Sequence, residues 1–131
     1  MKRLLLACFL LTATCTVPFI QTASAQMTPP PSVTLADFTT KINLLDTYIG
    51  AGDMVNAQAT WEVVHTMMGQ VLATSKYSIY SAATPADKTA HETILLNQRT
   101  IYFVIWGLKN DLATNRVAIH TKLVEFGGTI Y

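Results

Sequence analysis

The residues with the clearest chemical meaning are Glu62 and His65, which lie three positions apart. Residues with this spacing share one side of a helix, so a carboxylate and an imidazole can face the same metal ion. A di-iron site needs a second such pair, and neither His91 nor His120 follows a glutamate by three residues. The remaining hypothesis is a site for a single transition-metal ion, bound by Glu62, His65 and one of the other two histidines. The favoured interpretation is that each histidine lies at a seam between helices and bonds an ordinary polar partner.

A methionine and a histidine on facing helices are the second candidate site for a cofactor. Small exported helical bundles can hold haem between such a pair, and Met54 with His120 is the pair to test here. The chain has no Cys-x-x-Cys-His sequence, which excludes covalent attachment of the c type. Core methionines are far commoner than ligand methionines. We therefore expect no cofactor, with a transition metal or non-covalent haem as the alternative.

The sequence lacks several motifs that are typical of enzymes. There is no Gly-x-Ser-x-Gly elbow, no glycine loop to hold phosphate and no pair of acids spaced as in a glycosidase. Both cysteines, Cys8 and Cys15, lie in the segment that we expect to be removed on export. The processed chain then has no thiol nucleophile, thiolate ligand or disulfide. We predict that the protein is not an enzyme.

Four aromatic residues are the candidates for contact with a partner: Tyr77, Tyr80, Phe103 and Trp106. The two tyrosines belong to residues 73–84, which read either as a loop or as an extension of the preceding helix, and tyrosine on a loop favours an interface. The other two lie off the main apolar stripe of residues 85–108. Apolar area that a core does not absorb marks an association surface. The alternative is that residues 73–84 or the C-terminal tail cover it.

Helices are the elements expected to position these side chains. Apolar residues recur at spacings of three and four over residues 34–49, 53–72, 85–108 and 111–126, and no segment alternates with period two. The residues expected in the core are Trp61, Val64, Met68, Ile94, Ile101, Ile105, Ile119 and Leu123. Short connections favour an all-α, antiparallel four-helix bundle. A three-helix arrangement, with the third and fourth helices merged, is the alternative.

Capping residues support these boundaries. Thr34 with Asp37, and Thr84 with Pro85 and Asp87, are helix starts. The helix over residues 85–108 has apolar residues on most sides, which predicts that it is the most buried of the four.

The N-terminal residues read as a targeting segment. Two basic residues precede an apolar stretch, and Ala23-Ser24-Ala25 then gives the pattern that signal peptidase cleaves. A permanent membrane span is disfavoured, because three threonines and Pro18 interrupt the stretch. We expect a signal peptide over residues 1–25, a proline-rich spacer over 26–33 and a helical domain over 34–131. The protein is then exported, to the periplasm or the medium, with no stable membrane span after processing.

The charge balance limits the classes of partner. Residues 1–25 contain two basic residues and no acid, so the processed chain has 7 basic and 8 acidic residues. Nucleic-acid binding needs clustered positive charge, which this balance excludes. We expect a small exported bundle that acts by contact with an unknown protein partner or as a homo-oligomer. The alternative is a metal- or haem-binding bundle for electron transfer or metal handling.

Overall fold

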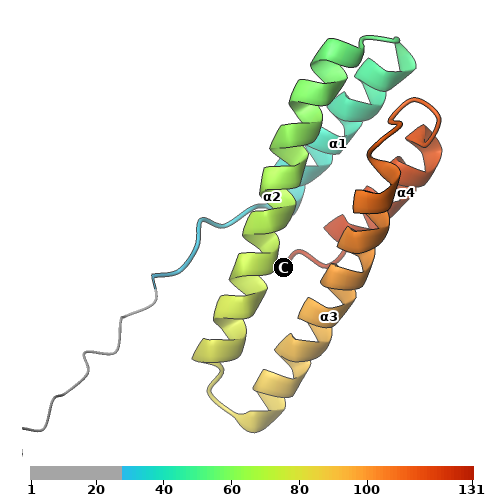
Figure 1. Ribbon diagram of the computed structural model, residues 1–131. Helices are drawn as coiled ribbons and strands as arrows, with labels where there is room; N and C mark the ends of the chain where they lie inside the picture. The colour runs from blue at the N-terminus through green and yellow to red at the C-terminus, as the bar shows by residue number, and fades with distance from the viewer. Residues whose placement is uncertain (1–27) are drawn as a thin grey trace, which may run out of the picture.

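The computed structural model describes residues 28–131, so the expected signal peptide and its cleavage site lie outside the described residues. Within this range the protein is all-helical and contains no strand, as the sequence predicted. The four helices are α1 (Leu35–Gly50), α2 (Met54–Ser81), α3 (Pro85–Leu108) and α4 (Arg116–Gly127) (Figure 1).

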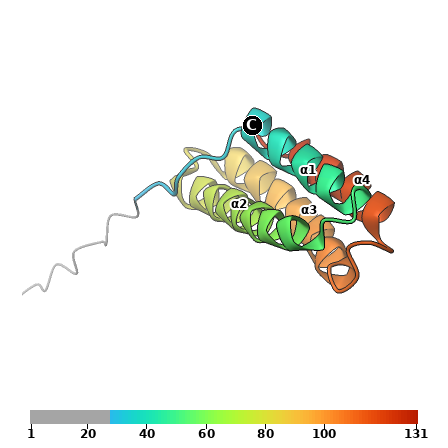
Figure 2. The ribbon, with the colours of Figure 1, turned by 90° about the horizontal axis from the view of Figure 1, so that it is seen from above.

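The helices pack as a bundle in which neighbours in sequence are neighbours in space. α1 packs on α2, α2 on α3, α3 on α4, and α4 returns to α1 (Figures 1 and 2). The predicted alternative, with the third and fourth helices merged, is wrong. At the end where they are joined, α2 and α3 extend well past α1 and α4 (Figure 1). No helix of residues 28–131 has the length and apolar character needed to cross a membrane.

The helix starts follow the predicted caps. The Thr34 hydroxyl accepts a hydrogen bond of 3.1 Å from the Asp37 N–H, and Thr84 does the same for Asp87. Asp53 accepts from the N–H of Asn56 at 3.2 Å and begins α2. The tight connection before it contains Gly52 at φ 73°, a left-handed conformation that favours glycine.

α2 is longer than the boundary predicted at residue 72, because residues 73–81 are helical rather than a loop. The buried stripe continues through Val71 and Ser75. The hydroxyls of Thr74, Ser78 and Ser81 each donate to a backbone carbonyl four residues earlier. Serine and threonine are common in loops because their hydroxyls can form hydrogen bonds with the nearby backbone. Here they form these hydrogen bonds within the helix.

α4 is shorter than predicted, because it begins at Arg116 and not at residue 111. Asp111 accepts the expected capping hydrogen bond, from the N–H of Thr114 at 2.9 Å, and this bond lowers the pKa of Asp111. The helix does not continue from there. The Asn115 side chain donates back to the Leu108 carbonyl at 2.8 Å and holds the connection as a separate turn, anchored by buried Leu112.

The core lies where the four apolar stripes meet. Every residue expected there is buried except Ile94, which is half-buried. Trp61 is only 2% exposed, and Phe38 of α1 meets Phe126 of α4 with ring centroids 5.8 Å apart. The tail folds back so that Ile130 packs against this core. Burial of such side chains is the main source of stability in a chain whose described part has no cysteine.

The expectation that the third helix is the most buried is wrong. α3 buries Gln98, Ile101 and Ile105, fewer residues than any other helix. Four of its large apolar side chains are exposed, namely Leu96, Phe103, Val104 and Trp106. The reason is geometric: a helix with two neighbours buries only the sector between them.

An ion pair joins α1 to α4. Both oxygens of Asp46 accept from the Arg116 guanidinium, at 2.7 and 2.8 Å, and this hydrogen bonding lowers the pKa of Asp46. Gly50 makes room for the pair, because a Cβ on this residue would lie 2.6 Å from Arg116 Nη1.

Arg116→Gln is expected to lower the free energy of unfolding at pH 7, because it removes both hydrogen bonds to Asp46. The pair contributes its full stability above the ordinary carboxyl pKa of 3.8 and loses it as the pH falls through the lowered pKa of folded Asp46. The difference between wild type and variant should therefore shrink between pH 5 and pH 2 in urea unfolding. Lys122→Gln, which breaks the exposed pair with Glu125, is the control and should change little. A difference that stays constant with pH would contradict this role for Asp46.

Candidate contact surface

His65 holds the α2–α3 seam together. Its Nε2 lies 2.7 Å from the hydroxyl oxygen of Tyr102, so one of the two groups donates and the other accepts. Its ring centroid lies 5.0 Å from that of Trp106. These contacts fit the favoured interpretation, in which the histidine bonds a polar side chain across a seam.

The other candidate metal ligands each have contacts elsewhere. Glu62 is exposed and accepts from Gln58 at 3.0 Å on the same helix. His120 Nδ1 lies 4.0 Å from Asp46 on α1, and His91 lines a cavity near the joined end of α2 and α3. Within residues 28–131, no three side chains of the ligand types His, Cys, Asp and Glu are grouped so that they could hold a metal ion.

The candidate haem ligands also come from different sides of the bundle. Met54 is 39% exposed in the first turn of α2. His120 belongs to α4, which packs on α1 and α3, and α2 lies diagonally across from it. The geometry gives the haem hypothesis no added support.

An aromatic cluster covers the α2–α3 seam near the end of α3. The His65 ring stacks with buried Trp61 at 6.3 Å, and Tyr102 stacks with Trp106 at 6.2 Å between ring centroids. Lys109 places its Nζ 3.3 Å from the centroid of the Trp106 ring, in a cation–π contact. These contacts fix Trp106 on a surface where it is 41% exposed.

The side of α3 opposite the core carries what we call the outer α3 face: Leu96, Thr100, Phe103 and Gly107, flanked by Val104 and Trp106. Leu96 and Phe103 are 67% and 68% exposed. The four central residues are spaced by four, three and four, which places them in one row on a helix. The row contains no charged residue, although the solvent side of a helix is ordinarily polar.

Gly107 is a second unusual feature of this face. Its φ is not positive, and a Cβ built on it would meet nothing within 4 Å. Neither the backbone nor the packing of the described residues therefore requires a glycine. Glycine within a helix costs up to about 1 kcal/mol relative to alanine. The absence of a side chain at Gly107 leaves the backbone exposed one turn from Phe103.

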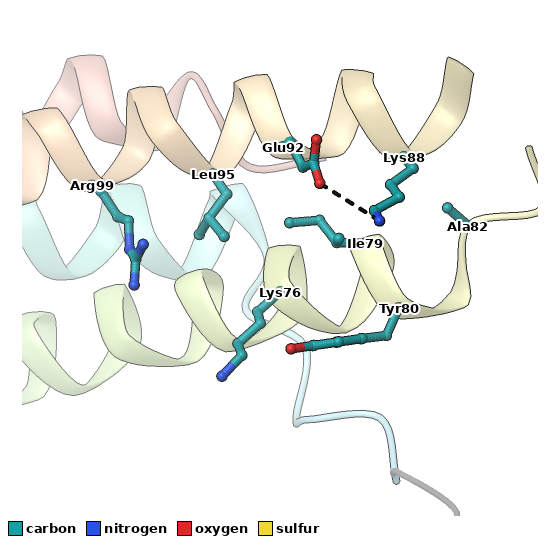
Figure 3. A pocket seen from close by; sticks show the side chains of 8 residues that line it. All are labelled: Lys76, Ile79, Tyr80, Ala82, Lys88, Glu92, Leu95 and Arg99. Carbon is teal, nitrogen blue, oxygen red and sulfur yellow. Dashed lines mark ion pairs between the residues drawn. The ribbon is translucent and has the colours of Figure 1, made fainter. Parts of the chain in front are cut away.

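The two predicted contact tyrosines lie at the far end of the seam. Tyr80 is 67% exposed and lines a cleft of about 500 Å³ together with Lys76 and Arg99 (Figure 3). Figure 3 shows Leu95 and Arg99 extending from α3 toward α2 across this cleft. Tyr77 is half-buried beside Thr28 and Pro30 of the spacer. The predicted contact residues thus lie on two separate parts of the surface, with the tyrosines at one end of the seam and Phe103 and Trp106 at the other.

Sequence reasoning identified Phe103 and Trp106 but missed Leu96, Thr100 and Gly107. The available signal was the second row along residues 85–108, which repeats at helical spacing on the side away from the core stripe. Comparison of the chain with protein-family models, curated proteins and solved structures gives no match. Functional inference therefore depends on the surfaces described above.

Proposed function

We propose that the protein acts by non-catalytic contact, that the outer α3 face is the contacting surface, and that its first partner is a second copy of the chain. The observation that carries this proposal is the order of large and small side chains in the row: Leu96, Thr100, Phe103 and Gly107 alternate large and small. The spacing of four, three and four reads the same in both directions.

Such a row is complementary to itself when two helices meet antiparallel. A two-fold axis near residues 101 and 102 pairs Leu96 with Gly107 of the second copy, and Thr100 with Phe103. Each large side chain then meets a small one, as knobs fit into holes. A two-fold contact uses the same patch on both copies, so one row supplies both sides. Gly107 has a role in this arrangement, because it receives Leu96 of the other copy.

The absence of charge in this row favours a second copy of the chain over a charged partner. The row from Leu96 to Gly107 is uncharged, and the first charged residue on this side of the helix is Glu92, one turn before Leu96. An acidic or basic partner would find no countercharge in the row, whereas a second copy brings apolar area to match. The proposal includes export: the processed chain, with 15 charged residues among residues 26–131, would associate outside the cytoplasm.

Phe103→Ser is expected to weaken self-association by about 30-fold or more, since a central aromatic anchor contributes about 2 kcal/mol. The variant should leave the stability of the single copy nearly unchanged, because the side chain is 68% exposed. Sedimentation equilibrium of wild type and variant over a range of concentrations measures the effect. Val117→Ser is the matched control, because Val117 is 78% exposed on α4, outside the outer α3 face.

The proposal fails if the wild type stays monomeric at millimolar concentration. It fails equally if Phe103→Ser and Val117→Ser weaken association to the same extent, since a general loss of apolar surface would then explain the result. A partner of another kind that binds the monomer through Phe103 would replace the second copy in this account.

A further inference from the structure

Because α2 and α3 are longer than α1 and α4, part of the inner surface of α2 and α3 is not covered by another helix. α2 and α3 extend past the start of α1 at Leu35 and the end of α4 at Gly127, so no helix covers their inner side there. Residues 32–33 and 129–131 lie over it instead and fill it incompletely. A cavity of about 320 Å³ remains, bounded by α2, α3 and the two terminal segments.

A buried amide borders this cavity. Gln98 is fully buried, at a position of the α3 core stripe where an apolar residue would ordinarily lie. Its Nε2 donates to the Thr129 carbonyl at 3.3 Å. Its Oε1 has no hydrogen-bond partner within residues 28–131. An unsatisfied buried oxygen is destabilising, so the fold alone does not account for Gln98.

The other walls combine polar groups with apolar ones. From α2 come the hydroxyl-bearing residues Thr74, Ser75 and Ser78, and from α3 comes His91. The hydroxyls of Thr74 and Ser78 donate to carbonyls of their own helix, which leaves their oxygens as acceptors. The apolar lining consists of Val33, Val71 and Ile130. No Lys, Arg, Asp or Glu side chain lines the cavity.

We propose that this cavity is a binding site for a small neutral molecule that carries a hydroxyl group on an apolar body. The hydroxyl would donate to Gln98 Oε1 and could accept from Ser75, while the body packs against Val71 and Ile130. A charged ligand is disfavoured, because no Lys, Arg, Asp or Glu side chain lines the cavity to compensate for its desolvation.

This site is independent of the proposed self-association. The cavity lies on the inner side of α2 and α3, whereas the outer α3 face points away from it. Ligand binding to the cavity can therefore be measured on the Phe103→Ser variant, which is expected to associate weakly, so the failure of one proposal can be told from the failure of the other.

Phenol is the probe, and toluene, which replaces the hydroxyl with a methyl group of similar size, is its control. Each is titrated to 5 mM into ¹⁵N-labelled protein while the amide resonances are followed, including the side-chain amide of Gln98. Phenol should shift the resonances of Gln98, Thr129 and Ile130 in a saturable way and bind about fivefold more tightly than toluene, which corresponds to one hydrogen bond.

Gln98→Leu keeps the volume of the side chain and removes the unsatisfied oxygen, which offsets the loss of the hydrogen bond to the Thr129 carbonyl, so the variant should fold about as stably as the wild type. It should bind toluene as well as phenol, because the preference for the hydroxyl is gone. Ser75→Ala, a smaller change, should reduce the same preference without removing it. Equal binding of phenol and toluene by wild type, an unchanged preference in Gln98→Leu, or no saturable shift with phenol would each overturn the proposal, the last leaving water as the occupant.

Discussion

Replacement of Trp61 by alanine is expected to lower the free energy of unfolding by about 3–5 kcal/mol. The side chain is 2% exposed on the core side of α2, so its loss leaves a cavity that the packed helices cannot fill. The change also removes the ring that stacks on His65, and His65 in turn bonds Tyr102 on α3. Core packing and the α2–α3 seam are therefore weakened together.

Urea unfolding followed by circular dichroism at 222 nm measures this effect. Trp106→Ala is the matched control: it removes the same side chain from the same cluster, but at a site that is 41% exposed, and should cost about 1 kcal/mol. Equal losses for the two variants would show that Trp61 is not the buried anchor of the bundle.

Helix positions could be predicted from sequence because local signals specified them. Thr34 and Thr84 make the hydrogen bonds to Asp37 and Asp87 that their spacing predicted, and α3 runs over the predicted residues 85–108. Apolar spacing alone located Trp61 in the core. These features depend on residues within one or two turns of each other, so no knowledge of the packing was needed.

Features that depend on packing were missed. Asp111 accepts two hydrogen bonds that are typical of a helix start, one from the N–H of Asn115 to its carbonyl and one from the N–H of Thr114 to its side chain. The helix nevertheless starts at Arg116, and the Asn115 side chain bonds the Leu108 carbonyl seven residues earlier, a contact that local signals do not predict. The apolar residues on several sides of α3 predicted burial, but the helix has two neighbours and its outer side stays exposed. Sequence cannot say which side lacks a neighbour.

The candidate sites show the same division. His65 was predicted to lie at a seam, and it does, but its partner Tyr102 is 37 residues away and could not be inferred from spacing. Gln98 was recognisable as a polar residue within an apolar stripe. Gln98 borders a cavity only because α2 and α3 extend past the start of α1 and the end of α4. This arrangement is a property of the assembled bundle and could not be predicted from the sequence of α3 alone.

Disulfide trapping on the outer α3 face tests the central claim, the symmetric contact between two copies. Cys8 and Cys15 are replaced by serine, and a single cysteine is introduced by Thr100→Cys or Thr89→Cys. Both threonines are exposed on α3, and each donates its hydroxyl to the carbonyl four residues earlier, so the two substitutions are closely matched. They differ in distance from the proposed two-fold axis. At a rise of about 1.5 Å per residue, the two copies of residue 100 are offset by about 5 Å along the helices and those of residue 89 by about 37 Å.

The account predicts that mild oxidation converts Thr100→Cys to a covalent dimer and leaves Thr89→Cys monomeric. A disulfide needs Cα atoms within about 7 Å, which only the first position offers in the antiparallel arrangement. The yield is read from a non-reducing gel, and adding Phe103→Ser to Thr100→Cys should reduce it sharply. Cross-linking of Thr89→Cys at the same rate as Thr100→Cys, or of neither variant, would contradict the proposed contact.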